Sequence, residues 1–121
     1  MVTRILIVDD KEQVRQDLRT VLTLSEDIEI LGEAANGLEA IRLVEILQPD
    51  VVLLDLEMPI MNGYDAVSAI KSLSPSRRVI VLTVHDYTAA RQKAFQAGAD
   101  SFIVKGSPVE QLIQVILEKQ D

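Results

Sequence analysis

Residues 51–55 read Val-Val-Leu-Leu-Asp, a run of four apolar residues that ends at once on a carboxylate. A run this short and this rich in branched side chains predicts a strand buried on both faces rather than a helix. Residues 28–30, Ile-Glu-Ile, alternate instead, which is typical of a strand at the edge of a sheet. Three other segments have the same character as the first and are also followed by a polar residue. They are Ile5 to Val8, Val79 to Leu82 and Phe102 to Val104.

The stretches between these runs have the periodicity of amphipathic helices. The first helix is expected to start at Asp10 and the second at Asn36, both residue types that cap helices. The last helix is expected to begin with Ser107 as its N-cap, ahead of Pro108 in the first turn. The third and fourth helices are expected over residues 64–73 and 87–97.

Five strands that alternate strictly with five helices predict a single α/β domain over residues 1–121. The continuous apolar runs favour central positions for strands one, three and four, and the alternating and short strands suit the edges. We therefore expect a doubly wound, flavodoxin-like parallel sheet in the order 2-1-3-4-5, with helices on two faces. Because crossovers are right-handed, the winding reverses between strands one and three, and this opens a crevice at the carboxyl ends of the strands.

Composition narrows the function classes. The 121 residues include no cysteine and one histidine, which excludes disulfides, thiolate zinc sites and histidine-rich metal sites. Any bound ion is then held by oxygen ligands, as Mg²⁺ or Ca²⁺ is. The net charge of −7 has the wrong sign for a nucleic-acid surface, so we expect no DNA binding by this chain itself. No apolar run is long enough to span a membrane, and we expect a cytoplasmic protein without membrane contact.

Functional side chains follow the predicted strands at the edge where the crevice should open. Asp9 and Asp10 follow the first strand, Asp55 the third, Thr83 the fourth and Lys105 the fifth. Each residue alone also has a simpler explanation. Asp10 could be a helix cap and Asp55 a loop carboxylate, while Thr83 could be a turn residue and Lys105 a solvated charge. Together, the three carboxylates should repel one another, so that one of them resists ionisation and a divalent cation relieves the repulsion. A cation there would also let a phosphoryl donor approach a carboxylate nucleophile.

This spaced set resembles the CheY-like receiver domain of two-component response regulators, over residues 4–117. The resemblance implies that Asp55 accepts a phosphoryl group from a sensor histidine kinase in the presence of Mg²⁺. It implies no enzyme activity beyond self-dephosphorylation. Metal ligands would be Asp10, Asp55 and the backbone carbonyl of Glu57, with Asp9 supporting or acting through water. The other implied roles are phosphate contacts for Thr83 and Lys105, switching for Thr83 and Phe102, and modulation of dephosphorylation for Glu57 and His85.

Residues 32–37 and 97–105 are most similar to the NarL/FixJ (LuxR-type) subfamily, whose receivers usually precede a helix-turn-helix domain. The similarity implies transcription regulation, with DNA bound only through a C-terminal domain absent from this chain. It also allows a homodimer through the face of helix four, strand five and helix five. Gly106 stands where many family members have proline after the lysine, so no cis peptide is expected there.

Three alternatives are weighed. The chain could be a stand-alone phosphorelay protein, a small Mg²⁺-dependent phosphatase of the haloacid-dehalogenase kind that forms an aspartyl-phosphate, or a receiver-like scaffold that never becomes phosphorylated, which the intact set of carboxylates, Thr83 and Lys105 disfavours. The sequence fits a phosphatase of this kind poorly. Asp55-Leu56-Glu57 differs from the Asp-x-Asp motif with which that family begins its site, and five strand-helix units leave no room for a substrate-covering cap. Outside the crevice, Lys71, Arg77 and Arg78 are expected to be surface charges.

Overall fold

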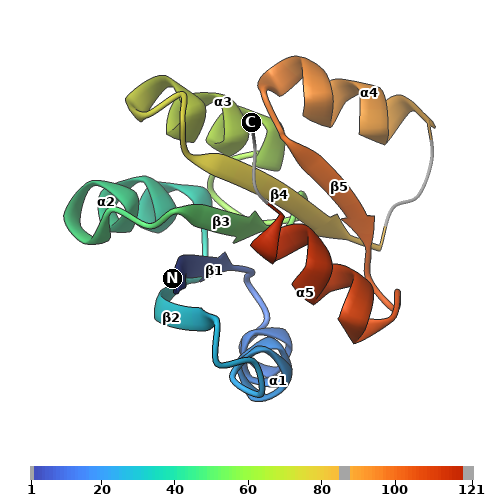
Figure 1. The fold of residues 1–121 in the computed structure, drawn as a ribbon. Coiled ribbons are helices and arrows are strands. Elements are labelled where there is room, and N and C mark those ends of the chain that lie inside the picture. Colours follow the sequence, from blue (N-terminus) through green and yellow to red (C-terminus); the bar gives the residue numbers. More distant parts are fainter. Residues whose placement is uncertain (1, 85–87, 119–121) are drawn as a thin grey trace.

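A computed structural model describes residues 2–84 and 88–118. Its five strands form one parallel sheet in the order β2-β1-β3-β4-β5, and helices cover both faces (Figure 1). The predicted fold class and strand order are therefore confirmed. The strands are β1 (Thr3–Val8), β2 (Ile28–Ala34), β3 (Val51–Leu54), β4 (Arg78–Thr83) and β5 (Ser101–Val104). The helices are α1 (Glu12–Leu22), α2 (Gly37–Leu47), α3 (Gly63–Leu73), α4 (Thr88–Ala97) and α5 (Val109–Leu117).

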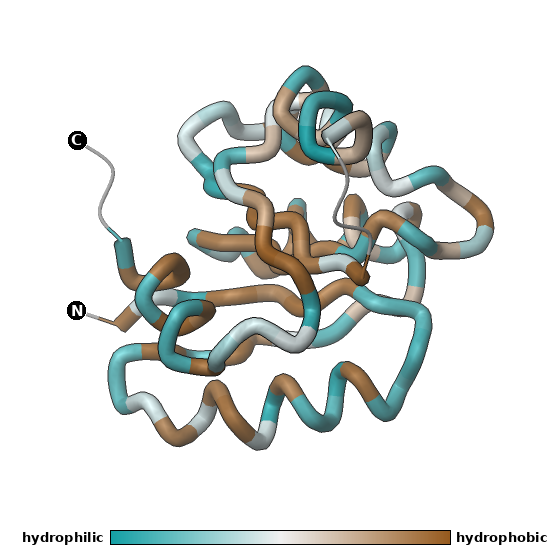
Figure 2. Tube along the Cα trace, turned by 90° about the vertical axis from the view of Figure 1, so that its right-hand side faces the viewer, coloured by the Kyte–Doolittle hydropathy of each residue, from teal (hydrophilic) through white to brown (hydrophobic). Residues whose placement is uncertain are grey.

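The sheet separates two apolar cores, because successive side chains of a strand point to opposite faces. On β1, Ile5 and Ile7 pack with residues of α1 and α5, whereas Leu6 and Val8 pack with residues of α2, α3 and α4. The four residues of β3 are at most 1% exposed, as expected for a central strand with helices on both sides. Figure 2 shows this concentration of apolar residues along the strands. Among the described residues, none of the helices is both long and apolar enough to cross a bilayer.

Helix starts were predicted with mixed success. Asn36 caps α2 as expected, since its side chain accepts a hydrogen bond from the Glu39 backbone N–H at 2.9 Å. The expected start at Asp10 was wrong, because Lys11 is the N-cap of α1 and it is the Asp9 carboxylate that accepts the Lys11 N–H. The expected cap at Ser107 was also wrong: α5 has Pro108 at its N-cap position, with no side-chain capping bond. Helix ends commonly differ by one or two residues between expectation and assignment, and both misplaced caps lie within that range.

The prediction of Lys71, Arg77 and Arg78 as surface charges was wrong. Lys71 Nζ donates to the carbonyl oxygens of Pro75 and Arg77 at 2.9 and 2.8 Å. Arg77 is only 6% exposed and its Nε donates to the Pro49 carbonyl at 2.7 Å. Arg78 donates to carbonyl groups in the last turn of α5. These side chains fasten loops and a helix end at the amino ends of the strands by donating hydrogen bonds to backbone carbonyl groups.

Asp100 completes this set of contacts and offers a test of its contribution to stability. One carboxylate oxygen accepts from Lys71 Nζ at 2.9 Å and from the Val79 backbone N–H at 2.8 Å. We expect Asp100→Ala to lower the free energy of unfolding by about 2 kcal/mol, since it leaves two partly buried donors without this acceptor. Urea denaturation measures the change. Glu45→Ala, which removes an exposed carboxylate of α2, should change stability by less than about 0.5 kcal/mol; equal effects of the two variants would contradict the prediction.

Candidate functional site

Parallel pairing brings two predicted acids together at the carboxyl ends of the central strands. Val8 of β1 pairs with Leu54 of β3, so Asp9 and Asp55 follow at neighbouring strand ends. The Asp55 N–H donates to the Val8 carbonyl at 3.0 Å, which fixes the level of the two residues. One carboxylate oxygen from each of Asp9, Asp10 and Asp55 lies within 4.8 Å of the others. The predicted convergence of the three carboxylates is found in the structure.

Lys105 brings a positive charge to the same cluster from the far edge of the sheet. Its Nζ lies 2.8 Å from Asp9 Oδ2 and 3.4 Å from Asp55 Oδ2. The Lys105 N–H donates to the Thr83 carbonyl at 2.7 Å, so the ends of β4 and β5 are joined beside the acids. Thr83 is fully buried at the end of β4. The structure thus places Lys105 against the acids and Thr83 at the adjacent strand end, as the sequence predicted.

Burial and charge both act on the Asp55 carboxyl group. The side chain of Asp55 is 4% exposed, and burial raises its pKa, with a further rise from the charge of Asp9; Lys105 and a backbone hydrogen bond from Glu57 act in the opposite direction. Burial also opposes the charged form of Lys105, but its hydrogen bond to Asp9 and the charges of Asp55 and Asp9 raise its pKa overall. A carboxylate that resists ionisation was predicted. Its main cause is desolvation rather than repulsion.

Asp9 and Asp10, which we call the acidic pair, differ in how many partners their carboxylates have. Asp9 is 2% exposed and both of its oxygens are engaged, Oδ1 by the Lys11 N–H and Oδ2 by Lys105. Asp10 is more exposed, with 33% of its side chain accessible, and its carboxylate contacts the Lys11 ammonium at 3.8 Å. The oxygens of Asp10 are therefore more available to a ligand, whereas the Asp9 carboxylate is bound to the Lys11 backbone and the Lys105 ammonium.

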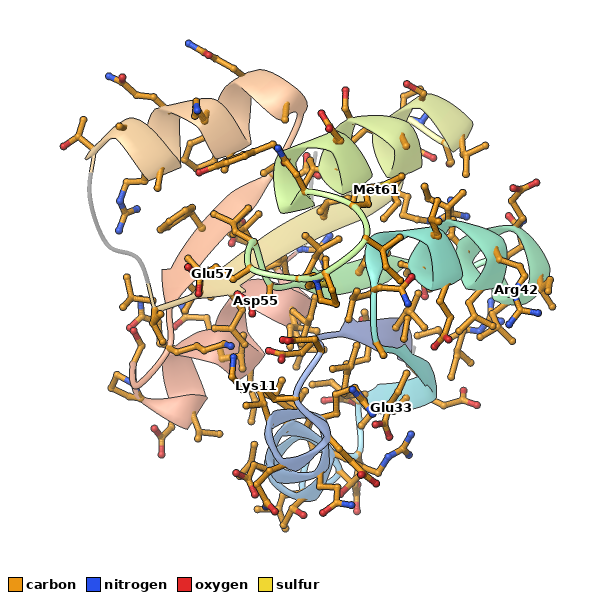
Figure 3. All side chains as sticks on the ribbon, turned by 180° about the vertical axis from the view of Figure 1, so that it is seen from behind. Lys11, Glu33, Arg42, Asp55, Glu57 and Met61 are labelled. Atoms are coloured by element: carbon orange, nitrogen blue, oxygen red, sulfur yellow. The ribbon has the colours of Figure 1, made fainter. Side chains whose placement is uncertain are left out.

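Among the remaining predicted residues, the structure describes Glu57 and Phe102. Glu57 is exposed and lies at the same end of the sheet as Asp55 (Figure 3). His85 lies outside the described residues.

Phe102 is 8% exposed, and the Arg91 guanidinium carbon of α4 lies 4.7 Å from its ring centroid. Beside it is a hollow of about 510 Å³ between α4, β5 and the start of α5. The described residues contain no cis peptide bond, and Gly106 has φ 95°.

Two features of the site were missed by sequence reasoning. The first is Gly63, where a Cβ would lie 2.5 Å from the Cα of Leu56, the residue after Asp55. The Asn62-Gly63 pair, a capping residue before a glycine, is a signal that could have drawn attention to this position. The second is Arg15 of α1, whose Nη1 donates to the Asp9 carbonyl at 2.6 Å. No local pattern marks that contact, because it depends on how α1 packs beside β2.

Comparison with known proteins gives consistent similarities. The family model described as the response regulator receiver domain matches residues 5–117. The uncharacterized transcriptional regulatory protein YhcZ of Bacillus subtilis strain 168 is 40% identical over 111 residues, which cover 92% of this chain and 52% of that protein. The chemotaxis protein CheY of Thermotoga maritima is 37% identical over 113 residues, covering 93% of each.

Solved structures are similar over nearly the whole chain. A two-component response regulator of the LuxR family from Aurantimonas sp. SI85-9A1 has a TM-score of 0.91 at 34% identity, covering 96% of this chain and 83% of that one. The chain spans about half the length of the first curated relatives that it matches, as the 52% coverage of YhcZ illustrates.

Proposed function

Because the chain belongs to the response regulator receiver domain family, with NarL/LuxR-type relatives, we propose that it is a phosphorylation switch in which Asp55 is the phosphoryl acceptor. The observation that carries the proposal is the buried Asp55 carboxylate at the end of β3, within reach of Lys105 Nζ and of two further carboxylates. Receiver domains take part in two-component signalling, and we propose a sensor histidine kinase as the phosphodonor and the cytoplasm as the place of action.

The donor set fits Mg²⁺, which prefers hard oxygen ligands and binds through one or two carboxylates. Asp10 and Asp55 are the proposed direct ligands, together with the Glu57 backbone carbonyl, and Asp9 is proposed to support them because its oxygens already have partners. The raised pKa of Asp55 supports the same assignment, since added positive charge would favour its ionised form. When bound, the ion supplies charge neutralisation that lets an anionic donor approach the carboxylates.

The proposed transfer joins a carboxylate oxygen of Asp55 to the phosphorus while the bond from phosphorus to the donor nitrogen breaks. The electron pair of that bond stays on the imidazole nitrogen of the donor, which then takes a proton. Lys105 is proposed to offset the negative charge that remains on the phosphoryl group, and the Thr83 hydroxyl to donate a hydrogen bond to it. Glu57 and His85 are proposed to modulate hydrolysis of the product.

The proposed output is a change of the face formed by α4, β5 and α5. Phosphorylation adds a charge of about −1.5 to −2, and movement of Thr83 toward it would alter the packing of Phe102 under Arg91. We propose this face as the contact with a second receiver. Relatives such as YhcZ and the nitrate/nitrite response regulator NarL extend beyond the matched region. The name of YhcZ, a transcriptional regulatory protein, supports transcription regulation, which we propose to occur through DNA binding by a longer protein. The length of CheY, of which the chain covers 93%, keeps the single-domain relay as the alternative.

Intact-mass measurement tests the proposal. The chain is incubated with a low-molecular-weight acyl phosphate, with Mg²⁺ or with a metal chelator, and the adduct is located by peptide mapping. One phosphoryl group on Asp55, formed with Mg²⁺ and lost slowly, is the expected result. Sustained release of inorganic phosphate without an adduct would identify a phosphatase, and the absence of both would leave a scaffold without phosphotransfer. We propose that the chain shows no turnover beyond loss of its own phosphoryl group.

A further inference from the structure

Arg15 reaches from the first turns of α1 to the backbone of the acidic pair. Its Nη1 donates to the Asp9 carbonyl at 2.6 Å, and its side chain is only 15% exposed. That carbonyl belongs to the peptide unit that joins Asp9 to Asp10. Because a peptide unit is planar, the direction of this carbonyl fixes where the Cα of Asp10 lies and limits where the Asp10 carboxylate can point.

Glu33 of β2 fixes the guanidinium of Arg15 in turn. Glu33 Oε1 accepts from Arg15 Nε at 3.0 Å, and Oε2 accepts from Arg19 Nε at 2.8 Å, so one carboxylate joins two successive turns of α1 to the edge strand. Figure 3 shows Glu33 between β2 and α1. The pKa of Glu33 is lowered because these hydrogen bonds and charges outweigh its burial. The anchor is therefore ionised at neutral pH.

The contacts of Asp10 show why the hydrogen bond from Arg15 to the Asp9 carbonyl matters. Asp9 is held by its own side chain and by its N–H, which donates to the Ala34 carbonyl at 3.0 Å. Within residues 2–84 and 88–118, the Asp10 carboxylate makes only one polar contact, a 3.8 Å approach to the Lys11 ammonium. Its position therefore depends on the backbone that carries it. An oriented ligand loses less freedom when a cation binds, and groups that orient ligands from behind commonly change metal affinity tenfold or more.

We propose that Arg15 is a positioning residue for the acidic pair, and that Glu33 acts through it by holding its Nε. The proposal rests on the proposed function in one respect, because it expects a divalent cation at Asp10. The direction of the expected change in Mg²⁺ affinity distinguishes this positioning role from a simple effect of charge. Removing a cation near a cation site should tighten Mg²⁺ binding by electrostatics alone, whereas loss of the carbonyl anchor should weaken binding.

Arg15→Met and Arg19→Met form a matched pair for the test. Both remove one cation and one contact with Glu33 from the same helix, but Arg19 is not bonded to the Asp9 carbonyl. Titration calorimetry with Mg²⁺ alone should give about a tenfold higher Kd for Arg15→Met, and a Kd within about twofold of the unchanged chain for Arg19→Met. Glu33→Gln should raise Kd to a smaller extent. Unchanged binding by Arg15→Met, or equal weakening by Arg19→Met, overturns the proposal.

A second measurement does not depend on metal. In the metal-free chain, hydrogen exchange at the Lys11 amide, which donates to Asp9 Oδ1, should be faster in Arg15→Met than in Arg19→Met. If the unchanged chain fails to bind Mg²⁺, the proposed function loses its cofactor, and the exchange rates still decide whether Arg15 orders the acidic pair. Equal exchange rates overturn the positioning role in that case. If Arg15→Met does not fold, Glu33→Gln is used for the exchange measurement alone, because loss of its negative charge would by itself weaken Mg²⁺ binding. Exchange at the Lys11 amide faster than in Arg19→Met is then expected, and equal rates overturn the proposal.

Discussion

Replacing Asp55 with asparagine is expected to abolish the phosphoryl adduct and, at neutral pH, to make the metal-free chain more stable. The adduct is lost because the amide of asparagine is a poor nucleophile and has no carboxylate oxygen to form the acyl phosphate. Stability rises because the buried Asp55 carboxylate is costly to ionise in the fold. We expect a gain of about 1 kcal/mol at pH 7, in the range typical of relieving a strained functional site.

The pH dependence of this gain follows from the direction of the Asp55 pKa shift. Since the pKa is raised in the folded state, the fold binds a proton that the unfolded chain releases, and its stability falls as pH rises from the ordinary aspartate value of about 3.9 through the raised value. Asp55→Asn removes this loss. The difference in unfolding free energy between variant and unchanged chain should be near zero at the acid end of that window and full above it.

Urea denaturation without metal, at a series of pH values, checks this expectation beside the mass measurement. Asp65→Asn is the matched control, because Asp65 is an exposed aspartate in the first turn of α3. It should keep the adduct and show no comparable gain of stability. An Asp55→Asn chain that still accepts one phosphoryl group would remove Asp55 from its proposed role, and a variant less stable at every pH would contradict the electrostatic argument.

Gly63→Ala is expected to be the most destabilising single methyl addition at this end of the sheet. The new Cβ would lie 2.5 Å from the Leu56 Cα and 2.7 Å from the Leu56 carbonyl oxygen, and backbone atoms cannot turn aside as a flexible side chain can. Either α3 or the segment after Asp55 must shift. We expect a loss of about 3 kcal/mol in unfolding free energy, at the upper end of the usual cost of overpacking. The protein that remains folded should bind Mg²⁺ more weakly, because Asp55 adjoins the displaced segment.

Gly106→Ala is a control with the opposite character. Gly106 has φ 95° but open space around its Cβ position, so alanine there meets backbone strain without a clash, at a cost of about 1 kcal/mol. Urea midpoints of the two variants separate the two effects. If Gly106→Ala proves the more damaging, the close approach of α3 to Leu56 is not the tighter constraint on the fold.

The strand order could be predicted because it depends on patterns within short segments. Apolar runs such as residues 51–54 and 79–82 mark buried strands, and the alternation at residues 28–30 marks an edge. The convergence of Asp9, Asp55 and Lys105 then followed from parallel pairing, since side chains after parallel strands meet at one edge. These predictions needed only local pattern and topology.

The errors concern contacts that no local pattern encodes. Lys71 and Arg77 are of residue types that usually lie at the surface. Only the path of the neighbouring loops shows which carbonyl groups they reach. The helix starts at Asp10 and Ser107 were misplaced by one residue, because capping preference alone does not fix the first residue of a helix: Lys11 and Pro108 hold the N-cap positions without a side-chain capping bond. Arg15 was missed because its partners, Glu33 and the Asp9 carbonyl, lie on other elements.

The ion pair between Asp9 and Lys105 joins residues 96 positions apart, from the first strand to the last. Asp9 and Asp10 are synthesised well before Lys105, which follows the final strand and reaches Asp9 across the sheet through the pairing of β5 with β4. Contacts this distant in sequence form late, because the intervening chain must be ordered first. A chain that ends before Lys105 carries the carboxylates without this counter-charge, so the proposed phosphoryl-acceptor site is complete only when β5 has joined the sheet.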